Sequence, residues 1–385
     1  MTEFCTPDDI NLDAFADLCQ QSVDRNDFPL ATSVRQNVVI YQGEKLTAAL
    51  EDDDEKKKVK GELHHCLKNG PGVFAIQDFY SDRNILDRST QIFEEIIARE
   101  KVNRSIVGDH FAKVGENERI WNSFQKVAER DPHAFIAYYK NPLFAIVSES
   151  WLGPGYQMTA QVNIVKPGGR AQTAHRDFHL GFQSDDLVQQ FPLPLQIASQ
   201  YLTLQGAIAH TDMPEETGPT LLLPFSQQYE MGYLAWRDEA FKQYFAKNAV
   251  QLNLKKGDAI FFSPALFHAA GANRSSNDRI ANLVQISAAF GKPMESINKY
   301  KMMKMIYPVL LENIGRRSIS QRELATIIAI VADRYSFPTN LDIVPPQGGH
   351  APETAHQLLK RAICEKWPYN QFEAAVDKHA RDRQA

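Results

Sequence analysis

The stretch that decides the fold is KKGDAIFFSPALFHAAGANRSSNDRIANLVQIS, from Lys255 to Ser287. It holds two short apolar runs, DAIFF (258–262) and RIANLVQIS (279–287), and the residues between them are rich in Gly, Pro, Ser and Asn. Short β-prone runs bounded by turn residues are typical of antiparallel sandwiches and barrels. The stretch therefore predicts two strands of such a core.

The same pattern of short β-prone runs bounded by turn residues extends over residues 157–290. Four more runs are rich in residues that favour strands: QVNIV (161–165), LTLQGAIA (202–209), TLLLP (220–224) and AVQLNL (249–254). This region is the predicted catalytic core. The predicted fold class is mainly β with flanking helices.

Helical patterns lie on both sides of this core. Before it, we expect a helix over 11–23, a strand over 37–41, a solvated helix face at 51–60, a strand over 72–79 (GVFAIQDF) and an amphipathic helix over 84–99. After it, we expect helices over 302–314, 321–335 and 352–378. The predicted organisation is an N-terminal helical and extended region at 1–71, a β-rich domain with its entry strand and helix at 72–292, and a C-terminal helical extension at 293–385.

The composition limits the classes of function that this protein can have. A net charge of −5 at 385 residues argues against a dedicated nucleic-acid binder, because phosphate binding usually leaves a basic footprint. No stretch has the length and apolarity of a membrane span, and the N-terminus lacks a signal-peptide pattern. The four cysteines form no CxxC pair. We therefore expect a cytoplasmic enzyme with a small-molecule substrate, without nucleic-acid or membrane partners, and the apolar C-terminal helices suggest a homodimer.

A candidate metal site lies in AHRDFHLGF (174–182) together with the segment after DAIFF. If AHRDFHLGF is extended, His175 and Asp177 point to the same face, and His268 supplies a third ligand. Two imidazoles and one carboxylate leave three positions of an octahedral ion open, which is the facial triad of non-haem iron(II) oxygenases. The alternative for His-x-Asp alone is a surface turn.

Arg279 is the candidate co-substrate ligand, eleven residues after His268. A guanidinium can hold the distal carboxylate of 2-oxoglutarate with two parallel hydrogen bonds, which an ammonium cannot match. Dioxygen would take the remaining position. The alternative is a surface arginine after the Ser-Ser-Asn-Asp turn.

Further candidates lie on neighbouring strands. Gln161 and Asn163 share one strand face, which predicts contact with 2-oxoglutarate or substrate, or else an outward solvent face. His179 lies two residues after Asp177, so in an extended strand it would point to the same face. It could contact the substrate, or it could have only a structural role. Phe178 could form a pocket wall, or pack in the core.

In this order and spacing, the motifs resemble the phytanoyl-CoA dioxygenase family of iron(II)- and 2-oxoglutarate-dependent oxygenases. The resemblance covers about residues 72–290 and is carried by four blocks: NIVKPGG (163–169) followed by HRD, EETGPTLLLPFSQQ (215–228), KKGDAIFFSPALFHAAGAN (255–273) and RIANLVQIS (279–287). The GVFAIQDF strand and the helix after it resemble the entry to the family's domain.

The resemblance implies a double-stranded β-helix, jelly-roll or cupin-like, with N-terminal helices and a C-terminal extension. It places iron on His175, Asp177 and His268 and 2-oxoglutarate on Arg279. Because the carboxylate of Asp177 is kept, hydroxylation or desaturation is favoured over halogenation. Two features depart from the family: Pro224-Phe225-Ser226-Gln227 replaces its usual Pro-Gly-Ser-His, and Gln205 or a small residue stands where an aromatic is common, so Gln205 is a candidate substrate contact.

The predicted function is hydroxylation of a small organic substrate with release of succinate and carbon dioxide. Three alternatives remain at this point. One is a natural-product oxygenase that desaturates, epimerises or rearranges its substrate. The others are a non-catalytic protein that binds 2-oxoglutarate or metal, and a cupin-like zinc hydrolase.

Overall fold

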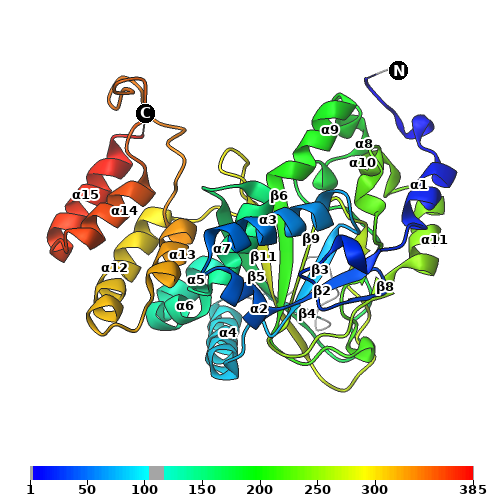
Figure 1. Cartoon of the computed structure of the whole chain (residues 1–385), viewed down its shortest axis with the longest axis horizontal. Coiled ribbons are helices and arrows are strands. Elements are labelled where there is room, and N and C mark those ends of the chain that lie inside the picture. The colour runs from blue at the N-terminus through cyan, green and yellow to red at the C-terminus, as the bar shows by residue number, and fades with distance from the viewer. Residues whose placement is uncertain (1–2, 104–116, 385) are drawn as a thin grey trace.

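The computed structural model describes residues 3–103 and 117–384, and its centre is an eight-stranded sheet (Figure 1). The strand order is β1-β2-β3-β9-β6-β11-β5-β4. In that order the strands span Ser33–Arg35, Val38–Gln42, Val73–Gln77, Ala259–Phe262, Thr203–Ala209, Arg279–Ser287, Gln157–Val165 and Asn117–Ile120. Every neighbouring pair is antiparallel except β2 and β3.

Strand β11 pairs along its whole length with β5. Arg279 lies opposite Val165 at one end and Ser287 lies opposite Gln157 at the other. On its other side β11 pairs with β6, and there Gln285 lies opposite Gln205. This register determines which side chains are neighbours in the site.

A smaller sheet has the order β10-β7-β8 and spans His268–Ala269, Leu221–Leu222 and Val250–Gln251. An antiparallel bridge between His175 and His268 adds the segment around His175 to its β10 edge. Four segments thus lie side by side in this second layer.

Helices cover one face of the large sheet. The alternate side chains that point to this face, such as Phe74, Val162 and Ile208, join the largest apolar cluster with residues of the helices. Burial of apolar surface of this kind is the main stabilising term of a fold. The helices before and within the catalytic region span Leu12–Cys19 (α1), Gly43–Ala49 (α2), Asp53–Lys68 (α3), Arg83–Asn103 (α4), Ser123–Arg130 (α5), Pro132–Tyr139 (α6), Pro142–Leu152 (α7), Asp185–Val188 (α8), Leu193–Ser199 (α9), Gly232–Ala235 (α10) and Glu239–Asn248 (α11).

The opposite face of the large sheet points toward the small sheet. Near β2, β3 and β9 it is apolar, with Val38, Ala75 and Ile260 in a separate cluster that reaches Leu222 of the small sheet. Toward β5, β6 and β11 the same face carries polar side chains, and the space between the two layers is a cavity. Short 3-10 segments connect the elements: Pro7–Asp9, Arg25–Asp27, His179–Phe182, Gln200–Leu202, Glu215–Thr217 and Ser226–Gln228.

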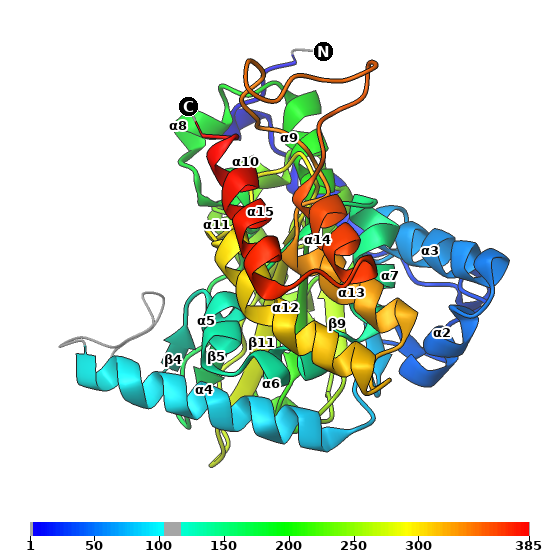
Figure 2. The same cartoon turned by 90° about the vertical axis from the view of Figure 1, so that its left-hand side faces the viewer.

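Four C-terminal helices pack together beside the sheet, as Figures 1 and 2 show. They span Lys299–Gly315 (α12), Gln321–Val331 (α13), Ala355–Cys364 (α14) and Tyr369–Arg381 (α15). Tyr307 of α12 donates to the carbonyl groups of Ala362 and Trp367, at 3.1 and 2.8 Å, and its ring stacks on Phe372 of α15. Helix α12 also contacts α5 and α6, so the C-terminal helices share the core of the large sheet.

Several predictions about elements are confirmed and two are wrong. The strand predicted over 279–287 has those bounds, and those over 202–209 and 258–262 are each one residue shorter. The description "mainly β" is wrong for the described residues, because only about 15% of them are in strands. The single helix expected over 352–378 is two helices, because Pro368 cannot continue a helix and begins the second one. Within the described residues, no helix is both long and apolar enough to cross a membrane.

A buried histidine at the end of β6 makes stability depend on pH. His210 Nδ1 lies 2.9 Å from Thr90 Oγ1, and Nε2 lies 3.0 Å from the Tyr138 hydroxyl. Burial and then the charge of Lys256 lower the pKa of His210 to about 3, against the opposing effects of the Leu86 backbone and Asp87. An unfolded chain takes up this proton near pH ~6.5, so the stability that His210 contributes is complete above that pH and is lost as pH falls toward about 3.

We therefore expect the melting temperature to fall less steeply between about pH 7.5 and pH 4.5 in His210→Gln than in the unsubstituted protein. Differential scanning calorimetry measures this slope. His133→Gln is the matched control, because His133 is exposed. Equal slopes in the protein and in His210→Gln would contradict this account.

Candidate functional site

The site is built around two histidines that face each other across two short segments. The backbone N–H of His175 donates to the carbonyl of His268 at 3.0 Å, and the reverse bond is 3.2 Å. Their ring centroids are 4.5 Å apart. The bridge thus brings together residues 93 positions apart in the chain.

Each imidazole is oriented by its own local backbone. Nδ1 of His175 lies 2.9 Å from the carbonyl of Thr173, and Nδ1 of His268 lies 2.8 Å from that of Leu266. A carbonyl oxygen only accepts, so each Nδ1 carries a proton, and in the neutral imidazole Nε2 then has a lone pair for a metal ion. This is the arrangement in which a neutral histidine binds a metal ion.

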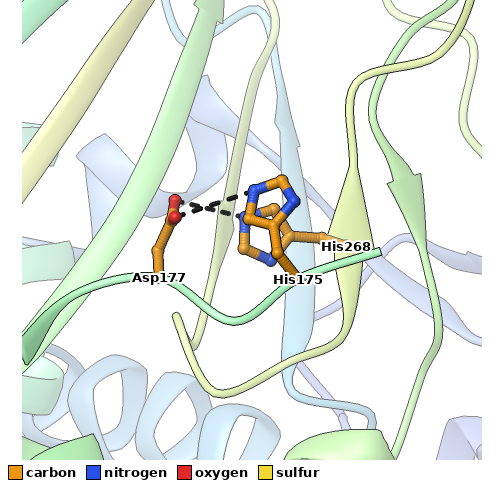
Figure 3. Close-up of side chains that lie close together, drawn as sticks. All are labelled: His175, Asp177 and His268. Carbon is orange, nitrogen blue, oxygen red and sulfur yellow. Dashed lines mark hydrogen bonds and ion pairs between the residues drawn. The ribbon is translucent and has the colours of Figure 1, made fainter. Parts of the chain in front are cut away.

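Asp177 completes the group (Figure 3). Its backbone N–H donates to the carbonyl of Pro264 at 3.1 Å. Oδ1 lies 3.6 Å from His175 Nε2, and Oδ2 lies 3.4 Å from His268 Nε2. One ligand atom from each side chain lies within 4.8 Å of the others, so the three residues could hold one metal ion.

The residue between the two ligands holds the segment in place. Arg176 points away from the group and is fully buried, where its Nη2 donates to the carbonyls of Ser226 and Tyr229 at 2.8 and 3.0 Å. Gly232 makes room for it, because a Cβ there would lie 1.9 Å from the guanidinium carbon. Arg176 thus anchors the segment on the side opposite to the metal-binding group, so that His175 and Asp177 point the other way.

The electrostatics favour the ionised form of Asp177 and the neutral form of His175. Burial alone would raise the pKa of Asp177, but His175, His268 and the hydrogen bond from Gln205 lower it well below its usual value. Burial, with His268 as the next cause, lowers the pKa of His175. A negative carboxylate beside neutral imidazoles is the protonation state that metal binding requires.

Arg279 opens β11 and is buried. Its Nη2 donates to Asn163 Oδ1 at 3.4 Å. Burial, and then the nearby charge of Arg119, lower its pKa to about 10, so it remains a cation at neutral pH. In residues 3–103 and 117–384, no carboxylate forms an ion pair with Arg279. A buried cation of this kind is suited to an anionic ligand.

The histidines, Asp177 and Arg279 line one cavity of about 620 Å³ between the two sheets. Asp177 is the only carboxylate in the described part of its lining. Apolar side chains make up much of the remaining wall: Trp121, Phe182, Trp236, Phe262, Leu283, Val284 and Met294.

The predicted polar residues Gln161, Asn163 and Gln205 also line this cavity. Gln205 Nε2 donates to Asp177 Oδ2. Asn163 Nδ2 and Gln205 Oε1 are buried and have no partner in the part of the chain that the structure describes. Since buried polar atoms are normally paired, both are suited to contact a polar ligand.

Phe178 and His179 do not line the cavity. A pocket position for His179 required the segment to be extended through it, and the segment is not extended there. The backbone turns after Asp177 into a 3-10 segment, with φ of 60° at Phe178 and 31° at His179. Phe178 is buried instead, and Phe182 reaches the cavity.

Sequence reasoning missed several polar residues of the cavity, among them Gln285 and Arg119. Gln285 shares the parity of Arg279 along β11, so the strand period could have identified it. Arg119 lies on β4, and its Nη1 donates to Gln161 Oε1 at 2.8 Å. No local pattern in the sequence marks Arg119, because its place in the site depends on the pairing of β4 with β5.

Comparison with known proteins identifies the family. The family model described as phytanoyl-CoA dioxygenase (PhyH) matches residues 69–281, which is more than half of the chain. The chain belongs to the phytanoyl-CoA dioxygenase family. The match contains all three candidate ligands and Arg279.

Curated proteins with similar sequences match only part of this chain. "Dioxygenase cdmD" of Talaromyces verruculosus is 27% identical over 173 residues, 44% of this chain and 52% of that protein. The uncharacterized protein YJR154W of Saccharomyces cerevisiae is 32% identical over 121 residues, 31% of this chain and 33% of that protein. "Dioxygenase andF" of Emericella variicolor is 24% identical over 186 residues, 47% and 60% of the two chains. The chain thus matches between a third and three fifths of the length of these relatives.

Some solved structures show a weak likeness to this chain. The α-ketoglutarate-dependent carbocyclase SnoK from nogalamycin biosynthesis has a TM-score of 0.43 and 18% identity, over 65% of this chain and 96% of that chain. HygX from Streptomyces hygroscopicus, solved with nickel and 2-oxoglutarate, has a TM-score of 0.40 and 10% identity, over 59% and 87%.

The geometry predicts a divalent-metal site that depends on Asp177. We expect the metal-free protein to bind Mn(II) with one site, and Asp177→Ala to weaken this binding by about 100-fold, because it removes the anionic ligand. Isothermal titration calorimetry measures both affinities.

Asp186→Ala is the matched control, since Asp186 is an exposed aspartate nine residues further along the chain. It should bind Mn(II) as tightly as the unsubstituted protein. Equal losses in both variants, or full affinity in Asp177→Ala, would show that Asp177 does not hold the ion.

Proposed function

We propose that this chain is an iron(II)- and 2-oxoglutarate-dependent dioxygenase that hydroxylates a small organic substrate. One observation carries the proposal: two histidines and an aspartate that could hold a metal share one cavity with a buried arginine. Membership of the phytanoyl-CoA dioxygenase family supports the same activity.

When bound, iron(II) and 2-oxoglutarate would supply oxidising power, because dioxygen converts the keto acid to succinate and carbon dioxide. One oxygen atom goes into succinate and the other into the C–H bond of the substrate, which becomes C–OH. The protein's task is to place these reactants and to exclude water.

The residues have separate roles in this proposal. His175, Asp177 and His268 would hold the metal on one face and leave its other positions open. Arg279 would bind the distal carboxylate of 2-oxoglutarate, and the unpartnered Nδ2 of Asn163 would donate to the same anion. Gln205 holds Asp177 Oδ2, so Oδ1 stays available as a ligand.

We also propose that the two sheets form a double-stranded β-helix. Its major layer would be β9-β6-β11-β5, and its minor layer would be β8-β7-β10 followed by the segment around His175. This arrangement has four strands on each side of the cavity. Strands β1 to β4 would then be additions at the two edges of the major layer.

The sequence left other functions open, and the cavity bears on them. A zinc hydrolase needs a general base in addition to its ligands, and the described cavity lining offers no carboxylate besides Asp177. A non-catalytic protein would not need the open coordination positions that the geometry leaves. Desaturation, epimerisation and rearrangement use the same residues, so product analysis distinguishes them from hydroxylation. The homodimer and the cytoplasmic location stay predictions.

The experiment is an anaerobic titration of the metal-free protein with iron(II) and 2-oxoglutarate. We expect a visible charge-transfer band from the chelate, which weakens in Asp177→Ala and in Arg279→Ala. Arg279→Lys should require about tenfold more 2-oxoglutarate for half-maximal absorbance, because an ammonium cannot make the bidentate contact.

Arg274→Lys is the control for Arg279→Lys, because Arg274 is exposed and its nearest carboxylate, on Glu215, is 4.0 Å away. It should leave the titration unchanged. A band should be followed by succinate release in air, with candidate substrates screened by the increase in that rate. If no band forms with the unsubstituted protein at any concentration, the oxygenase proposal fails.

A further inference from the structure

Two glutamines stand side by side on the cavity wall next to Asp177. Gln205 of β6 and Gln285 of β11 are directly opposite in the strand register, so their side chains leave the sheet on the same face. Both line the cavity, and only 6% and 8% of their surfaces are exposed. Each amide has one accepting and one donating end, so their orientations determine what the wall can bind.

The orientation of Gln285 is fixed by a chain of hydrogen bonds that begins at Arg119. A guanidinium only donates, so the atom of Gln161 that lies 2.8 Å from Arg119 Nη1 must be Oε1. The amide nitrogen of Gln161 then faces Gln285 at 3.3 Å, and the facing atom of Gln285 must be its oxygen. Nε2 of Gln285 is left as a donor, and no described residue accepts from it.

The orientation of Gln205 is fixed from the opposite side. A carboxylate only accepts, so the atom of Gln205 that contacts Asp177 Oδ2 must be Nε2. Oε1 of Gln205 is therefore an acceptor, and it is buried without a partner within the described residues. This assignment follows from the partners, which resolves the usual ambiguity between amide oxygen and nitrogen.

The wall beside Asp177 thus offers one donor and one acceptor on paired positions. We propose that it binds a neutral substrate group that donates a hydrogen bond to Gln205 Oε1 and accepts one from Gln285 Nε2. An amide, a lactam or a hydroxyl group meets this requirement. A carboxylate does not, because it would place lone pairs against the oxygen of Gln205.

The rest of the substrate is apolar. Phe182, Trp236 and Met294 line the same cavity, and 52% of the Phe182 surface is exposed. The substrate is therefore a mainly apolar molecule, held beside Asp177 by one neutral polar group. This inference rests on the proposed function, because it assigns the substrate of the same cavity.

The test compares probes that share an apolar body and differ in this group. They are 2-quinolinone, which donates and accepts, N-methyl-2-quinolinone, which only accepts, and 2-naphthol, which carries a hydroxyl. Ligand-observed NMR measures their dissociation constants with the protein alone and with Zn(II) and 2-oxoglutarate added. We expect 2-quinolinone or 2-naphthol to bind about tenfold more tightly than N-methyl-2-quinolinone, as one unpaired buried acceptor implies.

Gln285→Met should weaken the binding of both quinolinones by about tenfold, because it removes the donor to the carbonyl group that they share, at a similar side-chain volume. Gln285→Glu should do the same by turning the donor into an acceptor, and it serves if the Met variant fails to fold. Gln125→Met is the control, because Gln125 bonds Glu129 and Asn298 on the surface, away from the cavity. Melting temperatures of all variants establish that they are folded.

The ratio between 2-quinolinone and 2-naphthol shows whether an amide or a hydroxyl group is preferred. Equal affinity for the two quinolinones, no binding of any probe at millimolar concentration, or unchanged affinity for 2-quinolinone in folded Gln285→Met and Gln285→Glu would overturn the inference. If the preference is present but 2-oxoglutarate does not bind, the paired-glutamine site stands and the oxygenase proposal fails. If 2-oxoglutarate binds but the preference is absent, the oxygenase proposal stands and the paired-glutamine site fails.

Discussion

The site depends on the antiparallel bridge between His175 and His268. The two residues are 93 positions apart in the sequence, and two backbone hydrogen bonds between their segments hold the imidazoles next to each other. The same bridge extends the small sheet to a fourth segment, so one contact both closes the cavity and sets the distance between two ligands. Arg176, held among carbonyl groups on the other side, keeps His175 and Asp177 turned inward.

The pleat of the large sheet then determines the chemistry of the cavity. Along β5 and β11 alternate residues face either the helices or the small sheet. Val162 and Ile164 enter the apolar core, while Gln161, Asn163 and Arg279 enter the cavity. A shift of one residue in the pairing of β11 would turn Arg279 away from the cavity and toward the helices. The long register with β5 and β6 therefore protects both the core and the site.

The sequence was sufficient for features that depend on local pattern and motif. The period of RIANLVQIS predicted β11, and the His-x-Asp spacing with the later histidine predicted a group that the structure brings together. The prediction for His179 failed because strand parity holds only while the chain stays extended, and the turn at Phe178 ends it. Arg119 could not be found at all, because its contact with Gln161 arises from the pairing of β4 with β5.

The unpaired polar groups of the cavity explain why this site is open to ligands. A buried guanidinium without an ionic partner, and amide atoms without hydrogen bonds, each cost stability in the folded chain. Arg279, Asn163 and Gln205 bear this cost within the described structure. An anion on Arg279 and a hydrogen-bonding group on Gln205 would satisfy these atoms, so ligand binding and fold stability are coupled. Buried polar atoms without partners are expected at a functional site, where the residues meet the needs of ligand binding rather than those of packing.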